Sequence, residues 1–180
     1  ISARFSRERT SSCSRPPSTT MAAVLDSLVP GTRIGALAAP VARNLHLELD
    51  PAFGYSDDDY RAATGFRGIV VVVDESLSLG DRPSDSARIA RVLLDFESHE
   101  TAESMQTLLT RKLGPPERFC YTADVRFKVA LHFWPDEKSA GILLVVPLEA
   151  SRDAMLMFGS MRPDSHPDFR YARRGGCDAA

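Results

Sequence analysis

The chain has 180 residues, of which 43% are hydrophobic and 26% are charged, and its formal net charge is −2 at pH 7. This composition is typical of a globular domain with a sizeable core. The near-neutral charge gives no broad attraction for nucleic acid or anionic lipid. The longest apolar runs have the length of a strand, far short of the roughly 20 residues that span a bilayer. The sequence therefore predicts a soluble protein without a nucleic-acid or membrane partner.

Residues 1–20 are rich in Ser, Arg and Thr and poor in aliphatic side chains. Such a segment buries too little surface to offset its chain entropy, so we expect it to be disordered. Two origins stay open. The segment is either upstream sequence foreign to the native protein, which then starts at Met21, or an Arg- and Ser-rich organelle transit peptide.

The next part of the chain predicts short helices separated by turns. Residues 22–28 read as a helix that ends at Pro30-Gly31, and residues 40–46 read as a second helix with Pro40 in its first turn. Residues 50–65 read as a polar loop. The run Asp57-Asp58-Asp59 is interpreted as solvated, because calcium loops space their ligands alternately around a glycine.

Two strands and a helix are predicted from residue 66 to residue 116. Residues 66–74 are dense in β-branched side chains, and residues 88–97 alternate between apolar and polar. Ser98 is a suitable N-cap for an amphipathic helix, which Gly114 and the two following prolines end. The apolar stripe of this helix is Ala102, Met105, Leu108, Leu109 and Leu113.

Residues 125–148 predict a β-hairpin, the strongest pattern in the chain. In its first strand, alternation separates a buried wall from an outward face. The wall is Val125, Phe127, Val129, Leu131 and Phe133, and the outward face is Arg126, Lys128, Ala130, His132 and Trp134. Pro135 ends this strand, residues 136–139 form a polar turn, and residues 141–146 return as an apolar strand covered on most sides.

The sequence thus predicts an α+β fold, with an antiparallel sheet packed by helices on one face. The single domain is predicted to span residues 21–160, followed by a flexible tail at residues 161–180. Within the domain, Met155–Phe158 either covers an edge of the sheet or adds a last strand. The domain is either built from two tandem helix–strand–strand repeats, about 21–97 and 98–150, or the similar element order of its two halves is a coincidence.

This element order, with the helix end at Leu113-Gly114-x-Pro116, resembles the tandem repeats of the β-lactamase-inhibitor proteins and of small outer-membrane-assembly lipoproteins. Both families are exported, whereas this sequence predicts neither a secretory signal nor a lipidated cysteine. We therefore assign no family from the resemblance and transfer no residue role.

The cysteines and histidines give no catalytic or metal motif. Cys13, Cys120 and Cys177 are an odd set without zinc or redox spacing, which favours free thiols and the cytoplasm. The four histidines lie far apart in the sequence. Cys120 and His132 are candidates for a nucleophilic pair, but Cys120 is better interpreted as a small buried hydrophobe.

No dinucleotide, P-loop, zinc-protease or serine-hydrolase motif occurs in the sequence either. We therefore expect no catalytic residue, metal or cofactor and favour a non-enzymatic role.

The outward face of the hairpin is the predicted binding site. Arg126, Lys128, His132 and Trp134 share it, and Trp and Arg are enriched at binding hot spots. The basic residues favour an acidic protein partner. The opposing interpretation is that Met155–Phe158 covers Trp134. The alternative function is a small-molecule binder, or an enzyme, with a pocket between the sheet and residues 50–65.

Overall fold

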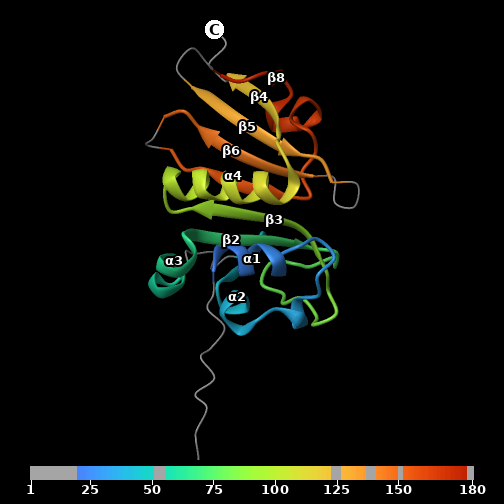
Figure 1. Ribbon diagram of the computed structural model, residues 1–180. Helices are drawn as coiled ribbons and strands as arrows, with labels where there is room; N and C mark the ends of the chain where they lie inside the picture. The colour runs from blue at the N-terminus through green and yellow to red at the C-terminus, as the bar shows by residue number, and fades with distance from the viewer. Residues whose placement is uncertain (1–19, 51–55, 123–126, 137–140, 150–151, 178–180) are drawn as a thin grey trace, which may run out of the picture.

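The computed structural model describes residues 20–50, 56–122, 127–136, 141–149 and 152–177. Within these ranges the protein forms one mostly antiparallel eight-stranded sheet, in the order β1-β2-β3-β7-β6-β5-β4-β8 (Figure 1). The helices α1 and α4 lie on one face of this sheet. The predicted α+β class is confirmed.

The elements follow one another in the chain in this order. The first half contains α1 (Met21–Ser27), η1 (Ile34–Ala36), α2 (Ala39–Arg43), β1 (Leu45–Leu47), α3 (Asp58–Thr64), β2 (Phe66–Val73) and β3 (Ile89–Phe96). The second half contains α4 (His99–Leu113), β4 (Glu117–Thr122), β5 (Lys128–Trp134), β6 (Ile142–Pro147), β7 (Met155–Phe158), η2 (Pro163–Ser165), η3 (Pro167–Phe169) and β8 (Arg173–Arg174). Among the described residues, none of the helices is both long and apolar enough to cross a membrane.

The caps of α4 are those that its sequence predicts. The Ser98 side chain accepts a hydrogen bond from the backbone N–H of Thr101 at 3.2 Å. At the other end Gly114 has φ +87°, a conformation that residues with a Cβ rarely adopt. α4 is therefore confined to the predicted span.

Two predictions for the first half are corrected. His46 belongs to β1, which pairs in parallel with β2, and not to the end of a helix. Residues 58–64 form a helix and not a loop, because the Asp57 carboxylate accepts a hydrogen bond from the Tyr60 N–H at 2.8 Å and so caps α3.

β7 joins the two halves of the sheet. It pairs antiparallel with β3 on one side and with β6 on the other, so that Leu156 lies between Leu94 and Leu144. Of the two readings of Met155–Phe158, a strand is therefore correct, although it lies inside the sheet and β8 follows it in the chain. The two predicted repeat units lie on either side of β7, and the repeat itself stays a prediction.

The face of the sheet that carries α1 and α4, here called the helix face, holds the larger core. A continuous row crosses it through Leu45, Ile69, Leu94, Leu156 and Leu144, each opposite the next in register. The helices pack Val24, Leu28, Met105 and Leu109 against this face. The predicted stripe of α4 is thus largely buried where helix and sheet meet, although Leu113 is exposed.

The second core lies on the opposite face. Val129, Leu131 and Phe133 are buried there, as the alternation of the hairpin predicts, and Phe127 is half-buried. Val125 lies outside the described residues. The segment that follows β7 covers this wall, because its residues Phe169 and Ala172 pack against the second core.

The C-terminal segment differs from the predicted flexible tail. From Pro163 to Arg174 it contains η2, η3 and β8, and the side chain of His166 is buried. Phe169 meets Tyr121 of β4 edge to face, with ring centroids 5.5 Å apart. This segment is therefore part of the packed structure, and the domain extends beyond the predicted limit at residue 160.

Candidate functional site

The predicted outward face of β5 is in fact the helix face, and one end of it is covered. Trp134 is only 2% exposed and belongs to the larger core. Its Nε1–H donates a hydrogen bond of 2.9 Å to the carbonyl oxygen of Gly114, at the end of α4. A buried indole requires such an acceptor. Trp134 is therefore a core residue, which corrects the prediction that it contacts a partner.

His132, the next residue on this face, is buried as well. It is 6% exposed and lies between Trp134 and Arg118, its register partner on β4. Burial, and secondarily the positive charge of Arg118, lower the pKa of His132 to about 4. The imidazole is therefore neutral at pH 7, and His132 is not the exposed contact that was predicted.

The face opens beyond His132. Lys128 is half-exposed at the far end of β5 and lies opposite Thr122 of β4, on the same face as His132. One row nearer, Cys120 lies opposite Ala130 on one side and opposite Arg173 of β8 on the other. In Figure 1, α4 lies in front of the middle strands, and β4 and β8 extend past it. Arg126 lies outside the described residues.

These uncovered strands surround a hollow of about 530 Å³, which we call the basic hollow. Its described lining contains three cations and no acid. The lining residues are Cys120, Thr122, Lys128, Tyr171, Arg173, Arg174, Gly176 and Cys177. The predicted site residues thus separate: Lys128 lines the hollow, whereas His132 and Trp134 are buried farther along β5 and are not part of its lining.

The cations of the basic hollow are not all neutralised. Arg174 lies 3.4 Å from a carboxylate oxygen of Glu117, which also holds Arg162 at 3.1 Å. Among the described residues, neither Lys128 nor Arg173 forms an ion pair. Two positive charges therefore face the hollow without a described counter-charge.

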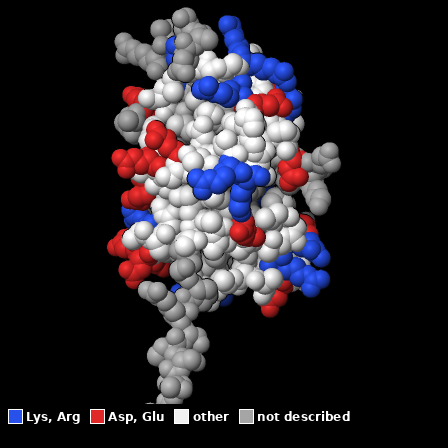
Figure 2. All heavy atoms as spheres, in the orientation of Figure 1, with Lys and Arg blue, Asp and Glu red and all other residues white. Residues whose placement is uncertain are grey.

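Basic and acidic side chains are unevenly distributed around this site. Figure 2, drawn in the orientation of Figure 1, shows several Lys and Arg side chains at the end where β4 and β8 lie, and others near the middle and at the lower right of the view. Acidic side chains gather along one side of the same view, the side on which α3 lies. The net charge of −2 thus hides a local positive region.

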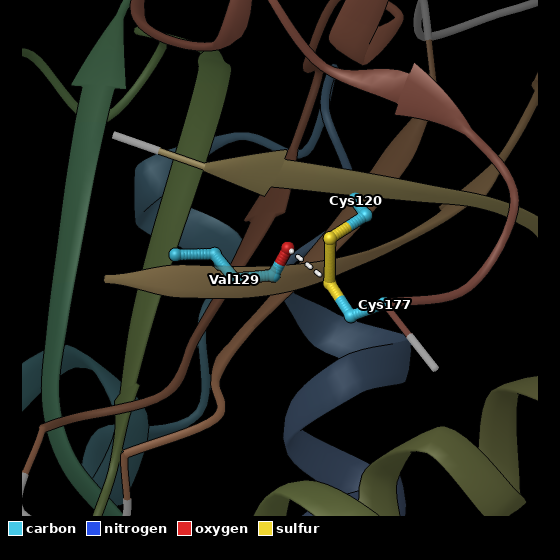
Figure 3. Close-up of a disulfide and its surroundings, with 3 residues drawn as sticks. All are labelled: Cys120, Val129 and Cys177. Atoms are coloured by element: carbon cyan, nitrogen blue, oxygen red, sulfur yellow. Dashed lines mark hydrogen bonds between the residues drawn. A yellow bond between two sulfur atoms is a disulfide. The ribbon is translucent and has the colours of Figure 1, made fainter. Parts of the chain in front are cut away.

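A disulfide forms part of the wall of the hollow. Cys120 of β4 is bonded to Cys177, 57 residues later, with their Cα atoms 4.9 Å apart (Figure 3). The Cys177 sulfur also lies 3.3 Å from the carbonyl oxygen of Val129. This bond corrects the expectation of free thiols, and it rules out Cys120 as a free nucleophile while the bond is intact.

Two other hollows are less suited to recognition. One lies between α1 and α4, has a volume of about 180 Å³ and is mainly apolar. The other, of about 130 Å³, lies beside β1 and β2. Its carboxylates are occupied: Glu48 pairs with Arg91, Glu75 accepts hydrogen bonds from Ser84, and Asp81 accepts one from the Ser78 N–H. The described lining of neither includes residues 50–65, where the alternative pocket was predicted, and residues 51–55 are not among those described.

One feature of the sequence points to this site. Arg173 and Arg174 form a basic pair, but only the pairing of β8 with β4 brings them to the hollow that Lys128 also lines. Local pattern does not encode that pairing. No protein-family model, curated protein or solved structure matches the chain.

Proposed function

We propose that this protein is a non-enzymatic interaction protein that binds an acidic segment of a protein partner in the basic hollow. The observation that carries the proposal is the pair of cations Lys128 and Arg173, which have no ion-pair partner among the described residues and lie on a part of the sheet that no described helix covers. Arginine binds carboxylates through two parallel hydrogen bonds, and lysine adds a point charge.

The size and surroundings of the hollow favour a short peptide. A volume of about 530 Å³ is in the usual range for ligand pockets and accommodates a few side chains. An extended polyanion would also meet the acidic side of the molecule visible in Figure 2. Tyr171, 69% exposed at the rim, adds a rigid aromatic surface of the kind enriched at interfaces.

The proposal includes the cytoplasm as the location of this binding, which follows the sequence-based expectation. In that compartment thiol reductants are abundant. The disulfide in the wall of the hollow would then be open to reduction.

The test is a calorimetric titration of the oxidised protein with a short poly-aspartate peptide at low salt. The double variant Lys128→Glu, Arg173→Glu should bind at least about tenfold more weakly, because charge complementarity becomes repulsion. The matched control is Arg82→Glu with Arg111→Glu, which makes the same change in net charge at two exposed arginines away from the hollow. The control should stay within about twofold of the wild type.

Two results would contradict the proposal. Equal weakening by both double variants would show that only the net charge matters. Unchanged binding by the site variant would place the acidic peptide elsewhere on the surface.

A further inference from the structure

The disulfide forms part of the wall of the proposed binding site, so its role in binding rests on the proposed function. Cys120 and Cys177 both line the basic hollow, so both sulfurs lie in its wall. The bond fixes the strand that carries Arg173 against the strand that faces Lys128. A change at the bond therefore alters the arrangement of the cations.

Apart from the disulfide, β8 is weakly held. It contributes two residues to the sheet, paired opposite Phe119 and Cys120. Next to it, the Gly175 N–H donates to the Arg118 carbonyl oxygen at 2.9 Å. The ion pair of Arg174 with Glu117 is exposed, and exposed pairs contribute little to stability.

The chain just before β8 is held by side-chain packing. Phe169 packs against Tyr121, and Ala172 packs against the second core. The side chains of Arg173 and Arg174 are exposed and bury no apolar surface of this kind. Breaking the disulfide should therefore release the chain from about residue 173 onward and leave η2 and η3 in place.

We propose that the Cys120–Cys177 disulfide is a redox latch that sets the affinity of the basic hollow for its acidic partner. In the oxidised form, Arg173 is held across β4 from Lys128, and both cations face the ligand in the hollow. A dithiol reductant breaks the S–S bond by supplying two electrons and two protons. The products are the two thiols and the oxidised, disulfide form of the reductant. β8 then separates from β4, and Arg173 leaves the hollow.

Binding to the reduced form is weaker for two reasons. The ligand meets Lys128 without the arginine that supplied the paired hydrogen bonds. Recovering that arginine requires the released segment to become ordered again, which costs conformational entropy.

The experiment compares the affinity for the poly-aspartate peptide with and without dithiothreitol, in a Cys13→Ser background that leaves only the two latch cysteines. Dithiothreitol is chosen because it is uncharged, whereas a carboxylate-bearing phosphine would compete for the hollow. We expect reduction to weaken binding about tenfold and reoxidation to restore it. Cys177→Ser should bind weakly in both conditions.

Trypsin gives a second readout that does not depend on the ligand. Cleavage after Arg173 and Arg174 should accelerate on reduction because the released segment enters the protease site more readily. Cleavage after Arg111 within α4 should not change.

The outcomes separate the latch from the proposed function. Equal affinity in the two redox states, with thiol counting to confirm reduction, overturns the latch and leaves the proposed function standing. Absence of binding in the oxidised protein overturns both. Two free thiols under oxidising conditions, or unchanged cleavage at Arg173 and Arg174, overturns the latch.

Discussion

At the scale of single residues, His132 lies where the helix face changes from apolar to polar side chains. The apolar row that crosses the sheet ends at Leu144, and the next two positions in register are His132 and Arg118. The Nδ1 atom of His132 is buried and has no hydrogen-bond partner among the residues described. An unpaired polar atom costs stability, so a leucine there should be better accommodated at neutral pH.

The burial of His132 makes a prediction about pH. Its pKa is about 4 in the folded protein against 6.5 for the ordinary side chain, so between these values the unfolded chain binds more protons. Folding stability should therefore be complete above about pH 6.5 and fall as the pH drops toward 4, by roughly 2–3 kcal/mol at pH 4.5.

The measurement is urea unfolding at neutral and mildly acidic pH, for wild type and His132→Leu. Burial also lowers the pKa of His166, which adds a pH dependence of the same sign, and the comparison with the variant removes it. In His132→Leu, the unfolding free energy should differ less between neutral and mildly acidic pH, because most of the part due to His132 is removed. Equal pH dependence in the two proteins would mean that His132 is protonated or exposed in the fold.

At the scale of elements, β5 passes from a covered end to an open end on a single face. Trp134 lies under α4, and Lys128 lies in the basic hollow six residues away. Trp134→Ala should cost about 3–5 kcal/mol of unfolding free energy because it removes a large buried side chain. Lys128→Ala should cost well under about 1 kcal/mol.

Chemical denaturation of these two variants and of Trp134→Phe tests this gradient along the strand. Trp134→Phe keeps an aromatic ring but leaves the Gly114 carbonyl without its donor, so its loss should be smaller than that of Trp134→Ala. Similar, small losses for Trp134→Ala and Lys128→Ala would show that Trp134 is not in the core.

Most elements are predictable from local pattern. The β-branched run of β2, the alternation of β3 and β5 and the two caps of α4 each specify a conformation without reference to distant residues. The helix α3 was also within reach, since Asp57 is a standard N-cap followed by two acidic residues in the first turn. Interpreting the three aspartates only as solvated side chains overlooks the N-cap that Asp57 provides for α3.

The sheet order and the covering of its faces are not local properties. Alternation shows that Leu131 and His132 face opposite ways, but not that helices cover one face and a C-terminal segment covers the other. The position of β7 between β3 and β6 and the pairing of two-residue β8 depend on contacts between distant residues. The candidate site was therefore only partly predictable: Lys128 was identified, and Arg173 was not.

At the scale of the whole molecule, the C-terminal segment closes the fold and completes the site. It covers the second core with Phe169, adds Arg173 to the basic hollow and returns to β4 through Cys177. A crosslink that closes a loop of this length is worth about 4 kcal/mol in the chain-entropy account. Stability and binding should thus respond together to the redox state.

The central claim is that an acidic ligand binds at the open end of the helix face. Hydrogen–deuterium exchange of the oxidised protein, with and without the poly-aspartate peptide, tests this most directly because it locates the ligand on the backbone. We expect slower exchange in residues 117–122 and 171–177, with no change in α4. Slower exchange in α1 and the C-terminal half of α4, around the apolar hollow, or no change anywhere in the protein, would contradict the claim.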